Sequence, residues 1–312
     1  MWLAVCLALA VVITIFVKIY AVVTCGRYKI DRDISKETVL ITGATSGIGK
    51  EVAAVLANCG ATLHLACRDF NRAAALAEEM REKIGNFRIF VWKLNLADLT
   101  SVREFAEKFS RAKHRLTVLI NNAGIGGVQR RTLTNDGLEL TIATNYIGPF
   151  LLTQLLIDQI EKGGRIINVS SIVQRLVNID PEDLNMERRK YDSFAAYARS
   201  KLAQIMFTRS LSHKLRPLGI TVNAVHPGAV RTRLFRDMTF LARLVLLVSY
   251  PFFKSASEGA ESIIYMAVSN DIKHISGHYF WDCNPASMNL QALDEQQCEL
   301  LWNTSLKVVG MG

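Results

Sequence analysis

Short runs of apolar, β-branched residues alternate with longer stretches of helical periodicity from about residue 36 onward. The short runs predict strands, and the longer stretches predict helices between them, most clearly at 50–58 and at 194–215, where Pro217 prevents continuation. Strands that alternate with helices predict an α/β fold, a doubly wound parallel sheet with helices on both faces. The predicted strands are 38–42, 62–66, 88–92, 116–120, 165–169 and 221–225.

The N-terminal residues follow a different pattern. No charge occurs from Trp2 to Val17, and Lys18 can extend its ammonium to a membrane interface, so residues 1–23 are predicted to form a transmembrane anchor. Residues 24–35 form a basic juxtamembrane linker, which predicts a cytosolic location for the rest of the chain. A cleaved secretory signal is the alternative, but it requires a basic segment before the apolar one. Glycosylation of Asn303, in the acceptor Asn303-Thr304-Ser305, would instead indicate a luminal domain.

Residues 36–312 show no internal repeat and no Pro/Ser-rich linker, so they are expected to be one domain with a C-terminal tail. Within it, 238–253 is strongly apolar with Arg243 as its one charge, and Pro251 interrupts it. This stretch is too short for a second membrane span. It is either a core helix or, as part of a segment near 232–255, an apolar substrate lid that touches the membrane.

Composition excludes several classes of protein. The chain has 312 residues, of which 50% are hydrophobic, so a disordered or low-complexity protein is excluded. The net charge of +9 favours an anionic surface or ligand, but the basic residues are scattered and no nucleic-acid motif is present. The six cysteines form no C-x-x-C pair, which predicts free thiols in a reducing compartment, and no metal site is expected.

A glycine-rich turn follows the first predicted strand. Residues 42–49 read TGATSGIG and lead into a predicted helix, so the backbone at Gly43, Gly47 and Gly49 can approach a pyrophosphate at the positive end of that helix. The second strand ends in Arg68-Asp69. Arg68 suits the 2′-phosphate of NADP(H), whereas Asp69 keeps NAD as the alternative.

Tyr197 and Lys201 stand four residues apart on one face of the predicted helix 194–215. The sequence Asn168-Val169-Ser170-Ser171 ends a strand shortly before this helix. A neighbouring ammonium and an oxidised nicotinamide both favour the phenolate of a tyrosine. Tyr197 is therefore a candidate acid/base, with Ser171 bonding the substrate oxygen and Lys201 holding the nicotinamide ribose.

Together with Asn121-Asn122-Ala123-Gly124, Asn145 and Pro227-Gly228, these motifs resemble the short-chain dehydrogenase/reductase superfamily over roughly residues 36–281. The resemblance implies a Rossmann-like dinucleotide-binding domain in which Tyr197, Ser171, Lys201 and Asn145 are catalytic. Asn145 would hold a water for a proton relay. The implied cofactor-binding residues are Gly43, Ser46, Gly47, Ile48, Gly49, Arg68, Asn95, Leu96, Asn122, Ala123, Gly124, Tyr197, Lys201, Pro227, Gly228, Val230 and Thr232. Asn95 stands where the family usually has Asp.

Three further stretches resemble the microsomal retinol dehydrogenases: 65–69, 277–283 and the tail 301–310. This resemblance implies an NADP(H)-dependent enzyme of the endoplasmic reticulum membrane that interconverts retinol and retinal and reduces other lipophilic aldehydes. A steroid, polyprenal or fatty-aldehyde substrate is the alternative. A non-catalytic NADP(H)- or lipid-binding protein is a third interpretation, against which the complete catalytic set argues. Superfamily members often associate, so a homo-oligomer is compatible with the resemblance.

Overall fold

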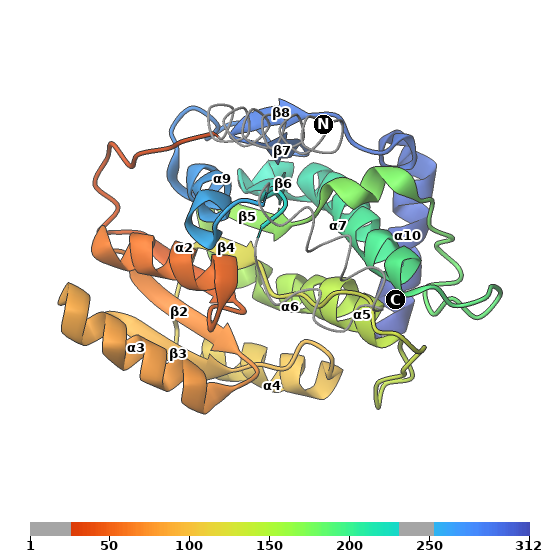
Figure 1. Cartoon of the computed structure of the whole chain (residues 1–312), viewed down its shortest axis with the longest axis horizontal. Helices are drawn as coiled ribbons and strands as arrows, with labels where there is room; N and C mark the ends of the chain where they lie inside the picture. Colours follow the sequence, from red (N-terminus) through yellow and green to blue (C-terminus); the bar gives the residue numbers. More distant parts are fainter. Residues whose placement is uncertain (1–25, 231–252) are drawn as a thin grey trace, which may run out of the picture.

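The computed structural model describes residues 26–230 and 253–312, and its centre is an eight-stranded sheet (Figure 1). The strand order is β3-β2-β1-β4-β5-β6-β7-β8, with β1 to β7 parallel and β8 antiparallel to β7. The strands are β1 Thr38–Thr42, β2 Thr62–Cys67, β3 Ile89–Lys93, β4 Leu116–Asn121, β5 Ile160–Val169, β6 Thr221–His226, β7 Tyr279–Trp281 and β8 Asn284–Ala286.

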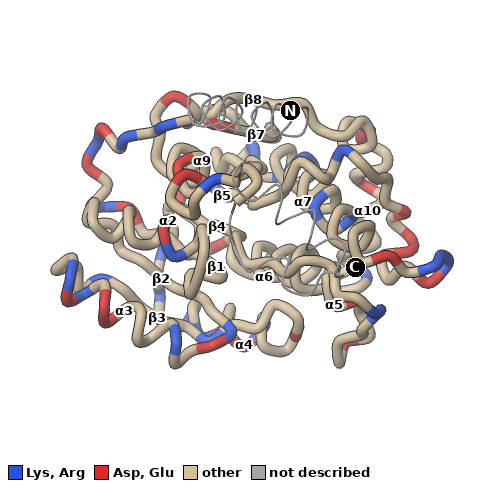
Figure 2. Tube along the Cα trace, in the orientation of Figure 1, with Lys and Arg blue, Asp and Glu red and all other residues tan. Residues whose placement is uncertain are grey.

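Helices cover both faces of the sheet, and each covered face has its own apolar core. Helices α2, α3 and α9 enclose one core, while α4, α6, α7 and α10 enclose the other. Charged residues lie mainly on the outer helices and loops (Figure 2). The helical elements are α2 Gly47–Asn58, α3 Phe70–Ile84, α4 Leu99–Arg111, α5 Leu140–Ile142, η1 Ala143–Ile147, α6 Gly148–Leu156, η2 Ile157–Gln159, η3 Ile172–Leu176, α7 Ser193–Leu215, η4 Arg216–Leu218, α9 Ala256–Val268, η7 Leu290–Leu293 and α10 Glu295–Val308.

The structure confirms the doubly wound α/β fold and corrects its details. All six predicted strands are present, although β5 begins five residues earlier than expected, at Ile160. Two further strands, β7 and β8, were not predicted, because three residues are too few for a periodic signal. The sheet is consequently not wholly parallel, since the hairpin between β7 and β8 adds an antiparallel edge strand.

The expected anchor 1–23 and most of the expected lid near 232–255, including Thr232, lie outside the described residues. Among the described residues, one helical run, Leu140–Gln159, is long and apolar enough to cross a membrane. Its most apolar window is 72% buried within the protein, so packing in the core accounts for its apolar character.

Candidate active site

The candidate site lies along the edge of the sheet at which the parallel strands β1 to β7 end, here called the carboxyl edge. Strand β1 ends at Thr42, and Gly43 follows with a φ of +71°. Gly47, with a φ of +57°, opens α2. Because the first backbone amides of a helix have no partner within it, this turn presents free donors and the positive end of the helix dipole to an anion.

The turn is packed too closely for any side chain at two of its glycines. A Cβ at Gly43 would lie 2.8 Å from Ala123 Cα, and a Cβ at Gly49 would lie 2.5 Å from Asn122 Nδ2. Asn122 fixes the turn from β4, since its Nδ2 donates to the carbonyl oxygens of Thr42 (3.0 Å) and Gly43 (3.3 Å). The residues expected to bind the cofactor at β1 and β4 therefore lie together in one rigid cradle.

At the end of β2, Arg68 and Asp69 are both exposed but differ in their hydrogen bonding. Asp69 is the N-cap of α3, and its carboxylate accepts a hydrogen bond from the backbone amide of Arg72 at 3.0 Å. Arg68 is exposed. Asp69 thus has a local structural role that satisfies part of its hydrogen-bonding capacity, whereas the Arg68 guanidinium reaches solvent beside the carboxyl edge.

Tyr197, Ser171 and Lys201 come together at the centre of the carboxyl edge. Tyr197 and Lys201 lie on α7, with Lys201 Nζ 5.7 Å from the centroid of the Tyr197 ring. Burial raises the pKa of Tyr197 to about 12, and the Ser171 side chain, which bonds the phenol, opposes that rise. Burial lowers the pKa of Lys201 to about 7. The expected promotion of a phenolate is therefore resisted by burial in the protein alone.

Lys201 is oriented by two acceptors. Its Nζ donates to the carbonyl oxygen of Val169 at 2.8 Å and to Gln204 Oε1 at 3.2 Å. A lysine ammonium has three donors, so these two bonds leave one donor for a ligand. A Cβ at Gly124 would lie 3.5 Å from the same Nζ, which shows how closely the loop after β4 approaches the amine.

Asn145 lies in η1, a π-helical turn between α5 and α6, rather than in a regular helix. Its side-chain amide donates to the carbonyl of Ile125 (2.9 Å) and to Ser200 Oγ (2.9 Å), and it accepts from the amide of Ile125 (2.8 Å). Its main-chain carbonyl accepts from Gln204 Nε2 at 2.7 Å. Short π-helical turns are rare and are frequently found at functional sites.

Ser200 and Gln204 join Asn145 to the helix that carries Tyr197 and Lys201, and the sequence interpretation missed both. Positions 197, 200, 201 and 204 share one face of α7 at helical spacing, and this spacing was the available signal. Polar side chains at Ser200 and Gln204 are 0% and 1% exposed, respectively, so this face is a polar face buried within the protein.

The segment after β6 closes the site beside β7. Gly228 has a φ of +91°, and the side chain of Lys254 lies against it, since a Cβ at Gly228 would be 2.7 Å from Lys254 Cδ. Pro227 and Val230 meet Ile48 around Gly259, where an added Cβ would touch all three. The structure thus brings the segment 227–230 next to the start of α2. The sequence analysis also missed Lys254, because only the fold brings it to Gly228.

Asn95 and Leu96 follow β3, near the end of the sheet where Arg68 lies. Asn95 Oδ1 accepts from the amide of Ala97 at 3.3 Å, and the Asn95 amide donates to Ser101 Oγ at 3.0 Å. Leu96 is buried, and its carbonyl oxygen would be 2.2 Å from a Cβ on Gly148. Ser46 is the N-cap residue of α2 and has an extended backbone.

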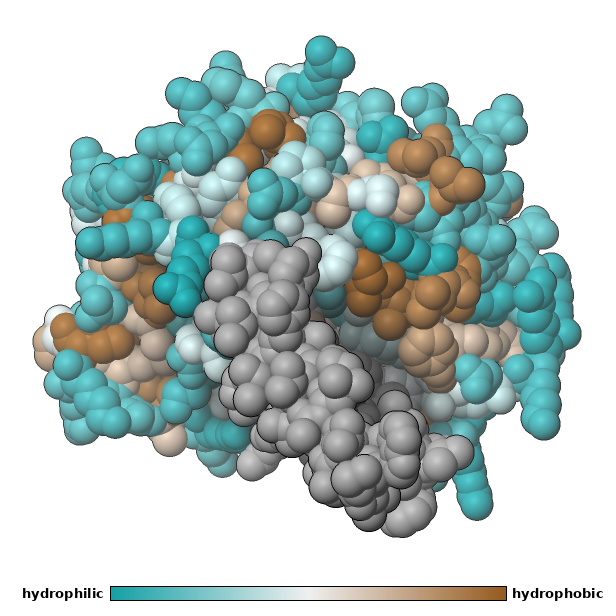
Figure 3. Space-filling view, turned by 45° about the horizontal axis from the view of Figure 1, so that its top comes forward, coloured by the Kyte–Doolittle hydropathy of each residue, from teal (hydrophilic) through white to brown (hydrophobic). Residues whose placement is uncertain are grey.

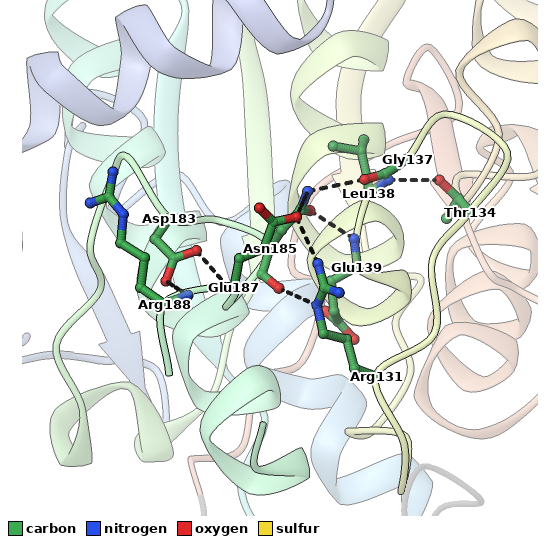
Figure 4. Close-up of polar contacts among 9 residues, drawn as sticks. All are labelled: Arg131, Thr134, Gly137, Leu138, Glu139, Asp183, Asn185, Glu187 and Arg188. Atoms are coloured by element: carbon green, nitrogen blue, oxygen red, sulfur yellow. Dashed lines mark hydrogen bonds and ion pairs between the residues drawn. The ribbon is translucent and has the colours of Figure 1, made fainter. Parts of the chain in front are cut away.

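The loop that leads into α7 is held by a polar network (Figure 4). Asn185 Nδ2 donates to the carbonyl of Gly137 (3.0 Å), and Asn185 Oδ1 accepts from the amide of Glu139 (2.9 Å). Arg131 bonds the carbonyl of Asn185 (2.9 Å) and the carboxylate of Glu187 (2.8 Å). The segment that leads into α7 is therefore tied to the loop that precedes α5 and η1.

Comparisons with known proteins identify the family of the chain. The family model of the short chain dehydrogenases matches residues 37–239. The chain belongs to this family. It is 40% identical to retinol dehydrogenase 13 of Mus musculus over 285 residues, which cover 89% of this chain and 85% of that protein.

Two solved structures share the fold. An uncharacterized protein from Mycobacterium paratuberculosis is 33% identical, with a TM-score of 0.73 over 88% of this chain and 94% of that one. A short chain dehydrogenase from Burkholderia cenocepacia in complex with NADP is 26% identical, with a TM-score of 0.64 over 80% and 97% of the two chains. This short-chain dehydrogenase is thus an NAD(P)-dependent oxidoreductase that acts on alcohols, and it resembles the retinol dehydrogenases.

Proposed function

We propose that this protein is a membrane-bound enzyme that transfers a hydride between NADP(H) and a lipophilic alcohol/aldehyde pair, retinol and retinal in the first instance. The observation that carries the cofactor choice is the contrast at the end of β2. Both side chains are exposed, but the Asp69 carboxylate bonds the start of α3, whereas the Arg68 guanidinium can form a fork-like contact with a 2′-phosphate.

The residues present fit a dinucleotide. The cradle formed by Gly43, Gly49 and Asn122 leaves room for backbone but not for side chains, as close approach of a pyrophosphate requires. In this proposal Ser46 to Gly49, Asn122 to Gly124 and Lys201 bind the phosphates and riboses. Asn95 and Leu96 bind the adenine side, and 227–230 with Thr232 bind the carboxamide.

The cofactor, when bound, supplies or accepts the hydride, and protein side chains donate or accept the proton. Tyr197 is the acid/base, since its hydroxyl bonds Ser171 and its ring lies near Lys201 Nζ. Ser171 holds the substrate oxygen. The side-chain amide of Asn145 is occupied by Ile125 and Ser200, and its main-chain carbonyl accepts one bond from Gln204. Its part in a proton relay therefore runs through the second lone pair of that carbonyl.

The relative's name, retinol dehydrogenase 13, supports a retinoid substrate, and the apolar residues 238–253 fit a lipophilic one. We propose residues 1–23 as the membrane anchor, 24–35 as a basic linker and 36–312 as the catalytic domain, facing the cytosol from the endoplasmic reticulum. Cytosolic NADPH would then drive the reaction toward reduction of retinal.

The first test is NADPH oxidation by membranes that contain the full chain, with all-trans-retinal as substrate. Tyr197→Phe removes the proton donor, so turnover should fall by about 10²- to 10⁴-fold. Binding of NADPH, followed by its fluorescence, should persist in this variant. Wild-type membranes that bind NADPH but turn over neither retinal nor a panel of steroid, polyprenal and fatty aldehydes would contradict the proposal.

A second test addresses the choice of cofactor. Arg68→Gln should raise the KM for NADPH by about tenfold or more while leaving the KM for NADH nearly unchanged, because NADH has no 2′-phosphate. Arg111→Gln is the matched control, since Arg111 is an exposed arginine on α4, away from the carboxyl edge. An equal effect of Arg68→Gln on the two cofactors would show that Arg68 does not read the phosphate.

A further inference from the structure

Two segments of the sequence, 1–25 and 231–252, join the described fold at the same turn; the first is apolar, and the second is apolar from residue 238 onward. Gly26, which follows the first segment, packs on the backbone of Asp282, where a Cβ on Gly26 would lie 2.4 Å from the Asp282 carbonyl. Lys254, two residues after the second segment, forms an ion pair with the Asp282 carboxylate. Asp282 and Cys283 form the tight turn between β7 and β8, both with positive φ.

Bonds to the body of the domain fix both attachment points. The amide of Tyr28 donates to Glu261 Oε2 at 2.7 Å, and the Tyr28 ring meets the Tyr265 ring edge-on at 5.2 Å, so the chain after Gly26 is held on α9. The amide of Lys254 donates to the carbonyl of Ala229 at 2.8 Å, and Lys254 pairs with Val230 in a parallel bridge. The segment 231–252 therefore starts and ends at neighbouring positions, beside the turn on which Gly26 packs.

The surface at this turn has the chemistry of a membrane interface. Trp281, at the end of β7, is 38% exposed, and Pro285 on the edge strand is exposed. Arg27 and Lys29 are exposed next to Gly26. Tryptophan and basic residues are enriched where proteins meet lipid headgroups. Figure 3 shows one face of the molecule, on which hydrophobic side chains gather in separate patches within a mostly hydrophilic surface.

We infer that the turn surface, defined as Arg27, Lys29, Trp281, Asp282 and Pro285, rests on the headgroups of a phospholipid bilayer. This inference rests on the proposed function, because it takes 1–23 to be membrane-inserted. One occupant satisfies all the observations. A bilayer would receive the apolar segment 1–23 and the apolar stretch 238–252, which join the domain at one turn, and its headgroups would contact an exposed tryptophan and two cations.

The turn surface also lies at the carboxyl edge, one strand from the segment 227–230. A substrate leaving the bilayer at this turn would meet the part of the site proposed to hold the nicotinamide. Arg68, at the end of β2, lies five strands away from β7 in the sheet order, on the side proposed for the adenosine phosphate. When the turn surface rests on a bilayer, the hydride-transfer end of the site therefore faces the lipid.

The experiment uses the full chain in phosphatidylcholine vesicles that contain phosphatidylserine and a lipid bearing a nitroxide at the headgroup. Cys6, Cys25 and Cys59 are replaced by serine, and the natural Cys283 is labelled with bimane, while Cys67 and Cys298 are 2% and 5% exposed and stay unlabelled. The matched control carries Cys283→Ser and Lys83→Cys. Lys83 lies on α3, which connects β2 to β3 at the other end of the strand order from β7 and β8, and its side chain is 72% exposed.

We expect the nitroxide to quench bimane at Cys283 several-fold more strongly than bimane at Lys83→Cys, and to the same extent at all protein-to-lipid ratios. Equal quenching at the two positions, in a chain that resists carbonate extraction, would overturn the inference and leave the proposed membrane anchor intact. If bimane at Cys283 were instead shielded from the nitroxide, and if this shielding disappeared on dilution of the protein, the occupant would be a second copy of the chain. That result would also overturn the inference. Release of the chain by carbonate would overturn both proposals.

Discussion

Gly49 shows how strictly a single position in the cradle is constrained. In Gly49→Ala the new Cβ would lie 2.5 Å from Asn122 Nδ2 and 2.6 Å from the carbonyl oxygen of Gly43, so the turn has to shift. We expect NADPH affinity, measured by fluorescence titration, to fall by about tenfold or more, because the backbone donors would no longer converge on the pyrophosphate. Lys50→Ala, one residue further along α2 and partly exposed, should change affinity little. Unchanged affinity in Gly49→Ala would show that the turn does not bind the cofactor.

Two buried histidines predict a loss of stability in acid. Burial lowers the pKa of His64 and of His226 to about 3 each, from a usual value of 6.5. Because the folded-state pKa lies below the unfolded one, the unfolded chain binds the protons first as pH falls. The contribution of the two histidines to the free energy of unfolding is therefore complete above about pH 6.5 and is lost between pH 6.5 and about 3. At pH 5 the loss is about 2 kcal/mol per histidine.

The contribution of His64 can be isolated by a substitution. His64 Nδ1 accepts a hydrogen bond from Trp92 Nε1 at 3.0 Å, and the side-chain oxygen of asparagine can accept the same bond. His64→Asn should therefore reduce the drop in unfolding temperature between pH 7.5 and pH 5, whereas His213→Asn, at an exposed position, should leave it unchanged. Measurement is by thermal unfolding of the detergent-solubilised chain. An identical pH dependence in all three proteins would refute the assignment.

Candidate site residues could be selected from the sequence where their spacing combines with a second motif nearby, here the strand end Asn168-Val169-Ser170-Ser171. Tyr197 and Lys201 are four apart on one helix, and the structure places the Tyr197 hydroxyl on Ser171 and Lys201 Nζ near the Tyr197 ring. Gln204 was not predicted, although it lies on the same face, because a glutamine there is equally compatible with an ordinary helix surface. Its bonds to Lys201 Nζ and to the Asn145 carbonyl depend on how η1 packs against α7, which the sequence does not encode locally.

At the scale of elements, helix α10 supports the π-helical turn η1. Ser305 Oγ donates to the carbonyl of Leu301, so the hydroxyl of Tyr146 is the donor in the 2.7 Å bond between Tyr146 and Ser305. Tyr146 is the residue after Asn145, and it is 1% exposed. Trp302, also on α10, stacks on Phe207 of α7 at 5.9 Å. The C-terminal helix is thus part of the core beneath the site.

Replacing Trp302 of α10 should therefore affect both the stability of the protein and its catalytic rate. Trp302 is 7% exposed, so Trp302→Ala should lower the free energy of unfolding by about 3 to 5 kcal/mol. Leu300→Ala, on the same helix but 38% exposed, is the matched control and should cost far less. Thermal unfolding and retinal turnover measure the two effects. A Trp302→Ala protein as stable as the Leu300→Ala protein would show that α10 is not part of the cooperative core.

The elements that the sequence did not predict share a physical cause. Strands β7 and β8 have three residues each, and their pairing depends on β6, whose Ala224 faces Tyr279. The π-helical turn at 143–147 follows three helical residues and shows no change in periodicity. Long periodic segments such as α7 were predicted to within a residue, because their own pattern specifies them, whereas short elements are specified by tertiary contacts.

At the scale of the whole molecule, the strand order arranges the proposed functions in sequence along the carboxyl edge. The end of β2 carries Arg68, the ends of β1 and β4 carry the glycine cradle, and Ser171 follows β5. The segment 227–230 follows β6, and the proposed bilayer contact lies at the end of β7. In this arrangement the charged end of the cofactor lies near solvent and the reacting end near the lipid, which suits a water-soluble cofactor and a lipophilic substrate.

The sequon at 303–305 permits a test of membrane orientation. Ser305 is buried and bonded to Tyr146, so packing of α10 already explains why a serine stands there, independently of glycosylation. Asn303 is exposed. In a cytosolic domain Asn303 should carry no glycan, so the chain expressed in cells should not change mobility on endoglycosidase H treatment.

The positive control for this orientation is a glycosylation acceptor tag fused ahead of Met1, on the side of the anchor proposed to face the lumen. Because the basic residues Arg27, Lys29 and Arg32 follow the anchor, the positive-inside rule places them in the cytosol and the tag in the lumen. The tag should therefore be glycosylated in the same chain in which Asn303 is not. A glycan at Asn303 would place the catalytic domain in the lumen and would remove cytosolic NADPH as the driving force for reduction of retinal.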